Sequence, residues 1–99
     1  MATYIVLGNF TDQGIRNIKD TTKRAEALRD MGKKAGVTVK EVYWTMGQYD
    51  IVAIFDAPND EAVTALGLSV GKLGNVRTQT LRAYTADEME RLLGKVASN

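Results

Sequence analysis

Six side chains have types suited to binding or transforming a small molecule, and they lie around one glycine-containing turn and along one later strand-like segment. They are Glu41, Tyr43, Tyr49, Asp50, Arg77 and Arg82. A desolvated carboxylate is a general base, and a neighbouring tyrosine hydroxyl is a proton donor or a hydrogen-bond anchor. Arginine binds a carboxylate through two parallel hydrogen bonds. We therefore predict these six residues as ligand-binding candidates and assign no catalytic set.

Each of these residues also has a structural interpretation. Asp50 stands beside a turn, where aspartate commonly accepts hydrogen bonds from backbone amides and fixes a hairpin, and this role is favoured over general-base chemistry. Tyr49 is of a type that packs more often than it reacts. Arg77 and Arg82 belong to an outer strand, where charge also keeps a sheet edge soluble. The sequence leaves the choice between these roles open.

The chain contains no cysteine and no histidine. Their absence excludes disulfides, thiolate or imidazole metal sites, histidine-ligated haem and nucleophiles activated by histidine. Asp56, Asp60 and Glu61 could chelate a hard cation, but helix capping and the helix dipole account for the last two. We predict no metal and no cofactor.

Length and charge limit the domain organisation and the partners. Ninety-nine residues, of which 44% are hydrophobic and 25% charged, predict a single globular domain over residues 1–99. A net charge of +1 provides no field for steering polyanions, and the basic residues of segment 11–36 are interleaved with Asp20, Glu26 and Asp30. We therefore predict no nucleic-acid partner.

The N-terminal residues lead directly into a strand-like segment, and no apolar run is long enough to span a bilayer. We expect a cytoplasmic protein without a membrane partner. Gly67, Gly71 and Gly74 lie within and at the end of a helical segment, so close helix packing explains them better than a phosphate-binding loop does.

Strand-like and helical segments alternate along the chain and must position the candidate residues. The strand-like runs are residues 3–10, 37–46, 49–57 and 75–84, and Gly47 and Gln48 predict a two-residue type II′ turn between the middle two. One helix is expected from a cap at Thr11 or Asp12 to Gly36. The other two are expected from Asn59 to Gly74, and after a capping box at residues 85–88.

The order β-α-β-β-α-β-α predicts an α+β, ferredoxin-like fold with an antiparallel four-stranded sheet and an extra C-terminal helix. Right-handed crossovers place the first and third strands in the middle of the sheet. Both of these strands are apolar on both faces, whereas two helices cover only one face. A second copy packed face to face is the economical cover, so we predict a homodimer or a higher homo-oligomer.

Counting outward from the predicted turn assigns side chains to the two faces. Tyr43 should oppose Val52 on the more polar face, together with Glu41 and Asp50, and this face is expected to meet the partner subunit. The residues expected on the helix-covered face are Trp44, Ile51 and Phe55.

The chain resembles the GYD-domain family, a group of small proteins in the dimeric α/β-barrel superfamily. The residues that carry the resemblance form three segments, VYWTMGQYD (42–50), DAPNDEA (56–62) and LGNVRTQTLRAY (73–84). The resemblance implies two sheets paired in a barrel with a cavity between them, and it supplies no established catalytic residues. Gly47-x-Tyr49-Asp50 and the strand after it are also similar, at the level of the fold, to effector-binding domains of Lrp-type regulators.

Two classes of function fit these observations. The first is a homo-oligomeric small-molecule-binding or assembly module with a pocket between paired sheets. The alternative is a cofactor-free dimeric-barrel enzyme of the oxygenase, isomerase or lyase type that uses carboxylate, tyrosine and arginine side chains. The binding module is preferred, because an enzyme without histidine and cysteine has few groups left for proton transfer.

Overall fold

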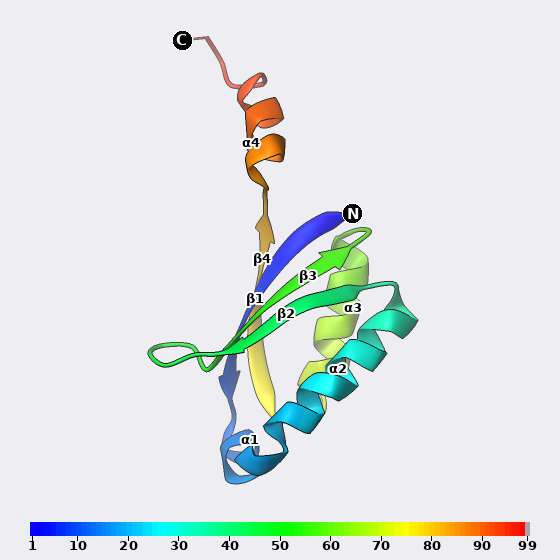
Figure 1. The fold of residues 1–99 in the computed structure, drawn as a ribbon, viewed down its shortest axis with the longest axis vertical. Coiled ribbons are helices and arrows are strands. Elements are labelled where there is room, and N and C mark those ends of the chain that lie inside the picture. Colours follow the sequence, from blue (N-terminus) through cyan, green and yellow to red (C-terminus); the bar gives the residue numbers. More distant parts are fainter. Residues whose placement is uncertain (99) are drawn as a thin grey trace.

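The computed structural model describes residues 1–98, and the fold is the predicted ferredoxin-like arrangement with one additional helix (Figure 1). The predicted domain boundary at residue 99 lies outside the described residues. The elements in chain order are β1 (Ala2–Phe10), α1 (Asp12–Arg16), η1 (Ile18–Asp20), α2 (Thr21–Ala35), β2 (Thr38–Trp44), β3 (Ile51–Ala57), α3 (Asp60–Gly71), β4 (Val76–Ala83) and α4 (Ala86–Leu93).

The four strands form one antiparallel sheet in the order β2-β3-β1-β4, so β1 and β3 are the central strands, as predicted. Tyr43 pairs with Val52, which confirms the register counted from the turn. A register shift between Val39 and Glu41 leaves Lys40 as an extra residue in β2, which the sequence analysis did not predict.

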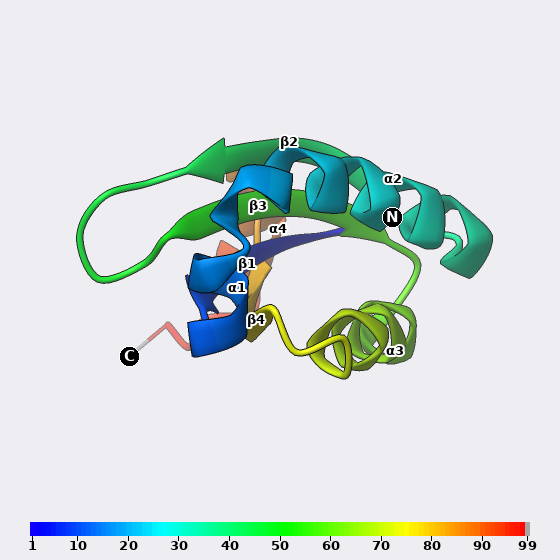
Figure 2. The same ribbon diagram turned by 90° about the horizontal axis from the view of Figure 1, so that it is seen from below.

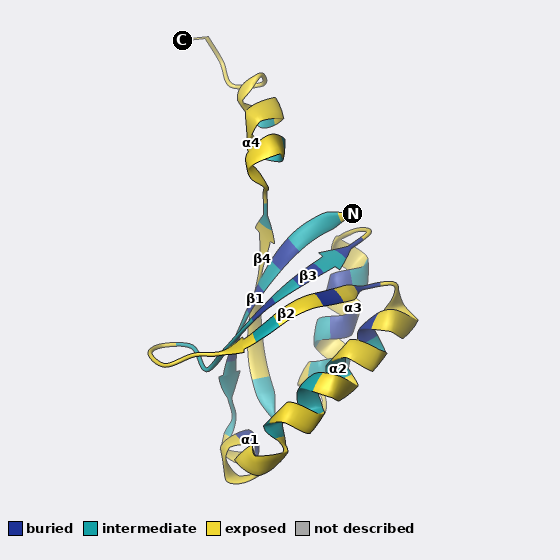
Figure 3. Ribbon diagram, viewed as in Figure 1, coloured by how far each residue is buried: buried dark blue, intermediate teal, exposed yellow. Residues whose placement is uncertain are grey.

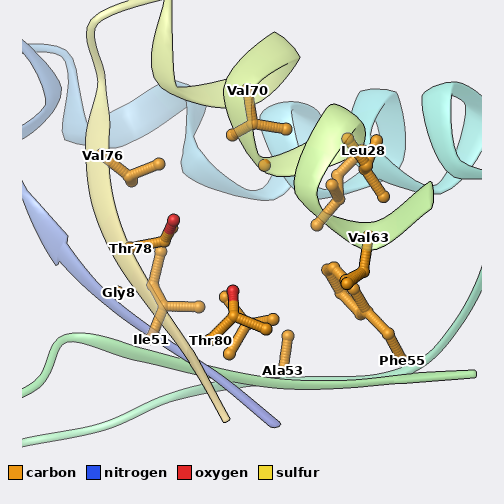
Figure 4. A pocket seen from close by; sticks show the side chains of 13 residues that line it. Gly8, Leu28, Ile51, Ala53, Phe55, Val63, Val70, Val76, Thr78 and Thr80 are labelled. Carbon is orange, nitrogen blue, oxygen red and sulfur yellow. The ribbon is translucent and has the colours of Figure 1, made fainter. Parts of the chain in front are cut away.

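Helices α2 and α3 pack on the same face of the sheet and build the core there. Leu28 of α2 and Val63 and Val70 of α3 lie over Ala53 and Phe55 of β3 (Figure 4). Figure 3 shows the buried residues on the two central strands, on the inner side of α3 and at the start of β2. The buried core residues are Tyr4, Val6, Val37, Val39, Ala53, Phe55, Ala57, Val63 and Leu66.

The first helical segment begins and ends as predicted, but the prediction of one continuous helix is wrong. The Thr11 side chain accepts a hydrogen bond from the Gly14 amide and caps α1, and Gly36 ends α2 with φ +77°. Between these ends the chain forms three pieces: α1, the 3₁₀ turn η1 and α2.

Asn17 is where the helix breaks, with φ −105° and ψ +35°. Arg24 donates hydrogen bonds to the carbonyl oxygens of Asn17 at 2.9 Å and Gly14 at 3.2 Å, which supports the break. Gly14 in turn lies against the backbone of Asn75, so closely that an added Cβ would be 2.0 Å from its carbonyl oxygen. Docking of α1 on the start of β4 therefore sets the break.

The connection between β2 and β3 is a loop of residues 45–50, and the predicted two-residue turn is wrong. The Thr45 hydroxyl donates to the Tyr49 carbonyl at 2.6 Å, and the Asn9 side chain donates to the Gln48 carbonyl at 2.7 Å. The Thr45 amide still donates to the Asp50 carbonyl at 2.8 Å, as in a hairpin, and Gly47 has the predicted positive φ, +103°. Figure 2 shows the loop at the opposite end of the sheet from α3.

Helix α3 ends earlier than predicted, at Gly71, and Gly74 adopts φ +85° in the turn that follows. The expectation that Gly67 and Gly71 serve close helix packing is wrong within this chain. A Cβ added at either position would have no heavy atom within 4 Å. These two glycines therefore border open space.

Candidate functional site

The second face of the sheet is apolar, although neither α2 nor α3 packs on it. Its centre consists of aliphatic side chains from the two middle strands, with Ile5 paired to Ile54 and Leu7 to Val52. On β4, Leu81 continues the same row opposite Ile5 and is 42% exposed. We call this surface of Ile5, Leu7, Val52, Ile54 and Leu81 the open face.

Polar candidate residues border the open face on both outer strands. Glu41 and Tyr43 are placed on β2 opposite Ile54 and Val52, and Arg77 is placed on β4 opposite Asn9. Three strand spacings of about 4.8 Å separate β2 from β4, or roughly 14 Å. One chain therefore brings these residues to one face, at opposite edges.

Asp50 binds backbone groups of β1 at the end of the open face. Its Oδ2 accepts a hydrogen bond from the Phe10 amide at 2.9 Å, and its own amide donates to the Gly8 carbonyl at 2.9 Å. The Asp50 carbonyl also accepts from the Thr45 amide at 2.8 Å. The first two bonds connect the loop to β1 and the third lies within the loop, and together they favour the structural interpretation of Asp50.

Tyr49 reaches from the loop to β4. Its hydroxyl donates to Oε1 of Gln79 at 3.3 Å. Gln79 pairs with Leu7 and shares the open face with Arg77, two residues before it. Gln79 was not among the predicted site residues, although its spacing of two from Arg77 on a strand indicates a shared face.

Arg82 lies on the other face, because it pairs with Tyr4 in a row that faces the helices. It therefore does not join Glu41, Tyr43 and Arg77. The spacing of five residues between Arg77 and Arg82 is odd, and odd spacing on a strand places side chains on opposite faces. The Arg82 guanidinium carbon is 5.6 Å from the centre of the Tyr4 ring and 4.5 Å from that of Tyr84.

A second polar cluster lies beside Arg82 at the start of α3. The hydroxyl of the buried Tyr4 donates to the Asp60 carboxylate, and this hydrogen bond, with desolvation, raises the pKa of Tyr4 above its ordinary value. Asn59 caps α3 by accepting from the Ala62 amide at 2.9 Å. The start of α3 is thus joined to β1 and held in place.

Arg82 also contacts the first turn of α4, where its guanidinium is 3.7 Å from the Glu88 carboxylate. Thr85 and Glu88 form the predicted capping box, with bonds of 3.2 Å and 2.9 Å. The hydrogen bond from the Thr85 amide is the main cause that lowers the pKa of Glu88.

The carboxylates within residues 1–98 form no metal site. No three of them lie close enough together to hold a metal ion, and no charged side chain in this range is buried. None of the helices described there combines the length and the apolar character needed to cross a bilayer.

Comparison with known proteins identifies relatives over nearly the whole chain. The sequence model described as GYD domain matches residues 4–93. The glutamine synthetase and cystathionine beta-lyase binding protein of Thermus thermophilus is 33% identical over 94 residues, which cover 93% of this chain and 99% of that protein.

Two solved structures share the fold. TTHA0845 from Thermus thermophilus is 28% identical with a TM-score of 0.56, over 87% of this chain and 96% of that chain. MtbAldR is 13% identical with a TM-score of 0.66, over 85% of this chain. The match spans 52% of MtbAldR, and at this identity it is a likeness of fold alone.

Proposed function

The chain belongs to the GYD domain family, and on that basis we propose that it is a homo-oligomeric binding module whose targets are other proteins. The relative from Thermus thermophilus carries the name of a binding protein for two enzymes, glutamine synthetase and cystathionine beta-lyase. The match covers 93% of this chain and 99% of that protein. We propose enzymes of these two kinds as the first targets to test.

The observation that carries the homo-oligomer is the open face. Its central side chains are as aliphatic as the core, yet no helix of the described chain lies on them. Contiguous apolar patches of this kind mark interaction sites, because leaving them in water is unfavourable. A second open face, related by two-fold symmetry, has the same shape and the same apolar character, so it is the proposed cover.

Pairing of two open faces also defines the finer proposal of a small-molecule site. Glu41 and Tyr43 from one copy would approach Arg77 of the other if the two sheets align, which one chain alone cannot achieve. A few polar groups on an otherwise apolar surface are typical of a small-molecule pocket. A compact carboxylate-bearing or aromatic ligand between the sheets suits this set.

The first experiment measures assembly and target binding in the same samples. Sedimentation of the wild-type chain at micromolar concentration should give a dimer or larger species. Ile54→Lys should give a monomer, because it places a charge in the centre of the open face. Met46→Lys is the matched control, since Met46 lies in the loop and is 97% exposed. It should leave assembly unchanged.

Binding of purified glutamine synthetase and cystathionine beta-lyase to the immobilised wild-type chain should be saturable. Circular dichroism of Ile54→Lys checks that the variant is folded before its loss of assembly is interpreted. A wild-type monomer at micromolar concentration would contradict the homo-oligomer. Saturable binding to neither enzyme would contradict the proposed targets.

A further inference from the structure

Helix α4 lies apart from the rest of the chain. It extends beyond the end of the sheet (Figure 1), and the chain measures 53 Å along its longest axis. The radius of gyration is 15.2 Å, whereas a compact chain of 100 residues has about 13 Å. Met89 and Leu93 on α4 are 45% and 50% exposed. An amphipathic helix of eight residues is not stable alone in water, so α4 requires a surface to pack on.

The orientation of α4 is set by the contacts at its start. Arg82 stacks on Tyr84 and pairs with Glu88, while the capping box fixes the first turn. Arg82 is itself anchored on β4 next to Tyr4 of the central strand. These contacts hold α4 away from its own sheet and helices.

A groove runs between α3 and β4 on the helix side of the sheet. Thr78 and Thr80 form its floor on the edge strand and are exposed. Gly67 and Gly71 give the α3 wall no side chains, and Leu68 beside them is 70% exposed. Within the described residues, α4 therefore packs in no groove, and no helix covers the groove between α3 and β4.

We propose that α4 of one copy docks in the α3–β4 groove of a second copy of this chain, with each copy donating its helix to the other. The charges are complementary, since Lys72 at the α3 wall of the groove is basic. Residues 86–93 carry the acids Asp87, Glu88 and Glu90 against the single base Arg91. Met89 and Leu93, one turn apart, would contact Leu68.

Interface area also favours a second copy as the occupant. Four strands about 4.8 Å apart and about seven residues long, at about 3.3 Å per residue, cover roughly 440 Å² in projection. A standard interface buries about 800 Å² of accessible surface on each partner, a quantity that follows the side-chain contours and so exceeds the projected area of the same face. Exchange of α4 adds a helix and a groove to each side of the same dimer. The inference thus rests on the proposed homo-oligomer and specifies how that oligomer is completed.

Cysteine crosslinking tests the exchange directly, because the natural chain has no cysteine. Leu68→Cys and Leu93→Cys are made as separate single variants, mixed and oxidised mildly. A disulfide should join position 68 of one chain to position 93 of another. It should form about 100-fold faster than in the control mixture of Leu93→Cys with Lys33→Cys on the outer surface of α2, because docking raises the local thiol concentration to the millimolar range.

The double variant Leu68→Cys/Leu93→Cys separates the alternatives. A disulfide between two chains supports the exchange of α4. A disulfide within one chain means that α4 packs in the groove of its own chain, and this result overturns the exchange. A dimer in sedimentation without linkage above the control overturns the exchange and leaves the proposed function intact. A monomeric wild-type chain overturns both. Protection of the thiol in the Leu93→Cys variant only when a target enzyme is added would assign α4 to the enzyme and also overturn the exchange.

Discussion

The two middle strands are apolar on both faces of the sheet, but the two faces have opposite surroundings. On one face, Tyr4, Val6, Ala53 and Phe55 are buried beneath α2 and α3. On the other face, their immediate neighbours along the same strands remain partly exposed, Ile5 and Ile54 among them.

The contrast separates what the chain needs in order to fold from what it needs in order to assemble. Burial within one chain accounts for the covered face, since its residues form the core cluster with the helices. Nothing within the described chain accounts for aliphatic residues on the open face. Their hydrophobic free energy becomes available only when another surface covers them.

The largest effect is expected from paired truncations on the two faces. Phe55→Ala should lower the free energy of unfolding by about 3–5 kcal/mol, because it removes a buried aromatic side chain from the core. Its loss of stability should not depend on protein concentration. Ile54→Ala, one residue away, should act through association, so its loss should grow as the protein is diluted.

Thermal unfolding over a range of protein concentrations measures both variants. A loss of stability for Ile54→Ala that is independent of concentration and equal to that for Phe55→Ala would contradict the contrast between the two faces. It would mean that the open face stabilises the fold of a single chain.

An intermediate effect is expected for the charged residues at the open face. Asp50→Asn should destabilise the fold by about 1 kcal/mol, because it weakens the charge-assisted hydrogen bond from the Phe10 amide. Glu41→Gln keeps the same shape and removes a charge that is exposed, so its stability should stay within about 0.5 kcal/mol of the wild type. Urea unfolding measures the free energy of unfolding of both variants. Equal stability of the two variants would exclude the structural role of Asp50.

The smallest effect concerns pH and contrasts two tyrosines. The hydrogen bond to Asp60 raises the pKa of Tyr4 above its ordinary value of 10.0, so the folded state holds this proton more tightly than the unfolded state does. The resulting stabilisation is present below pH 10 and is lost as the pH rises through the raised value. Tyr4→Phe should therefore reduce the alkaline loss of stability.

Tyr43→Phe on the open face is the matched control for this measurement, because Tyr43 is 51% exposed. It should retain the alkaline dependence of the wild type in unfolding experiments between about pH 9 and pH 11. If both variants lose that dependence to the same degree, the bond between Tyr4 and Asp60 is not its source.

Local signals predicted most of the element boundaries. Thr11, Asn59 and Thr85 cap helices in the structure, and Gly36 ends α2 in the left-handed conformation. These features depend on residues within a few positions, where side-chain to backbone bonds and the freedom of glycine act directly. The register of Tyr43 with Val52 was predictable for a similar reason, since strand alternation has a fixed period.

Two of the failures involve contacts between distant segments, and a third does not. Periodicity continued through Asn17, but docking of Gly14 on Asn75 breaks the helix there. The predicted tight turn was opened by the Asn9 side chain, which is 39 residues from the Gln48 carbonyl it binds. Arg82 was grouped with the candidate site although alternation already placed it with Tyr4 on the other face.

The sequence by itself determined the order of the elements, the central position of β1 and β3, and the two-sided apolar character of these strands, because periodicity and capping are local properties. Only the tertiary structure decided where the first helix breaks, how the loop between β2 and β3 is held, and that α4 extends away from its own core. These outcomes depend on the competition between packing surfaces far apart in the chain, and neither helical nor strand periodicity encodes that competition.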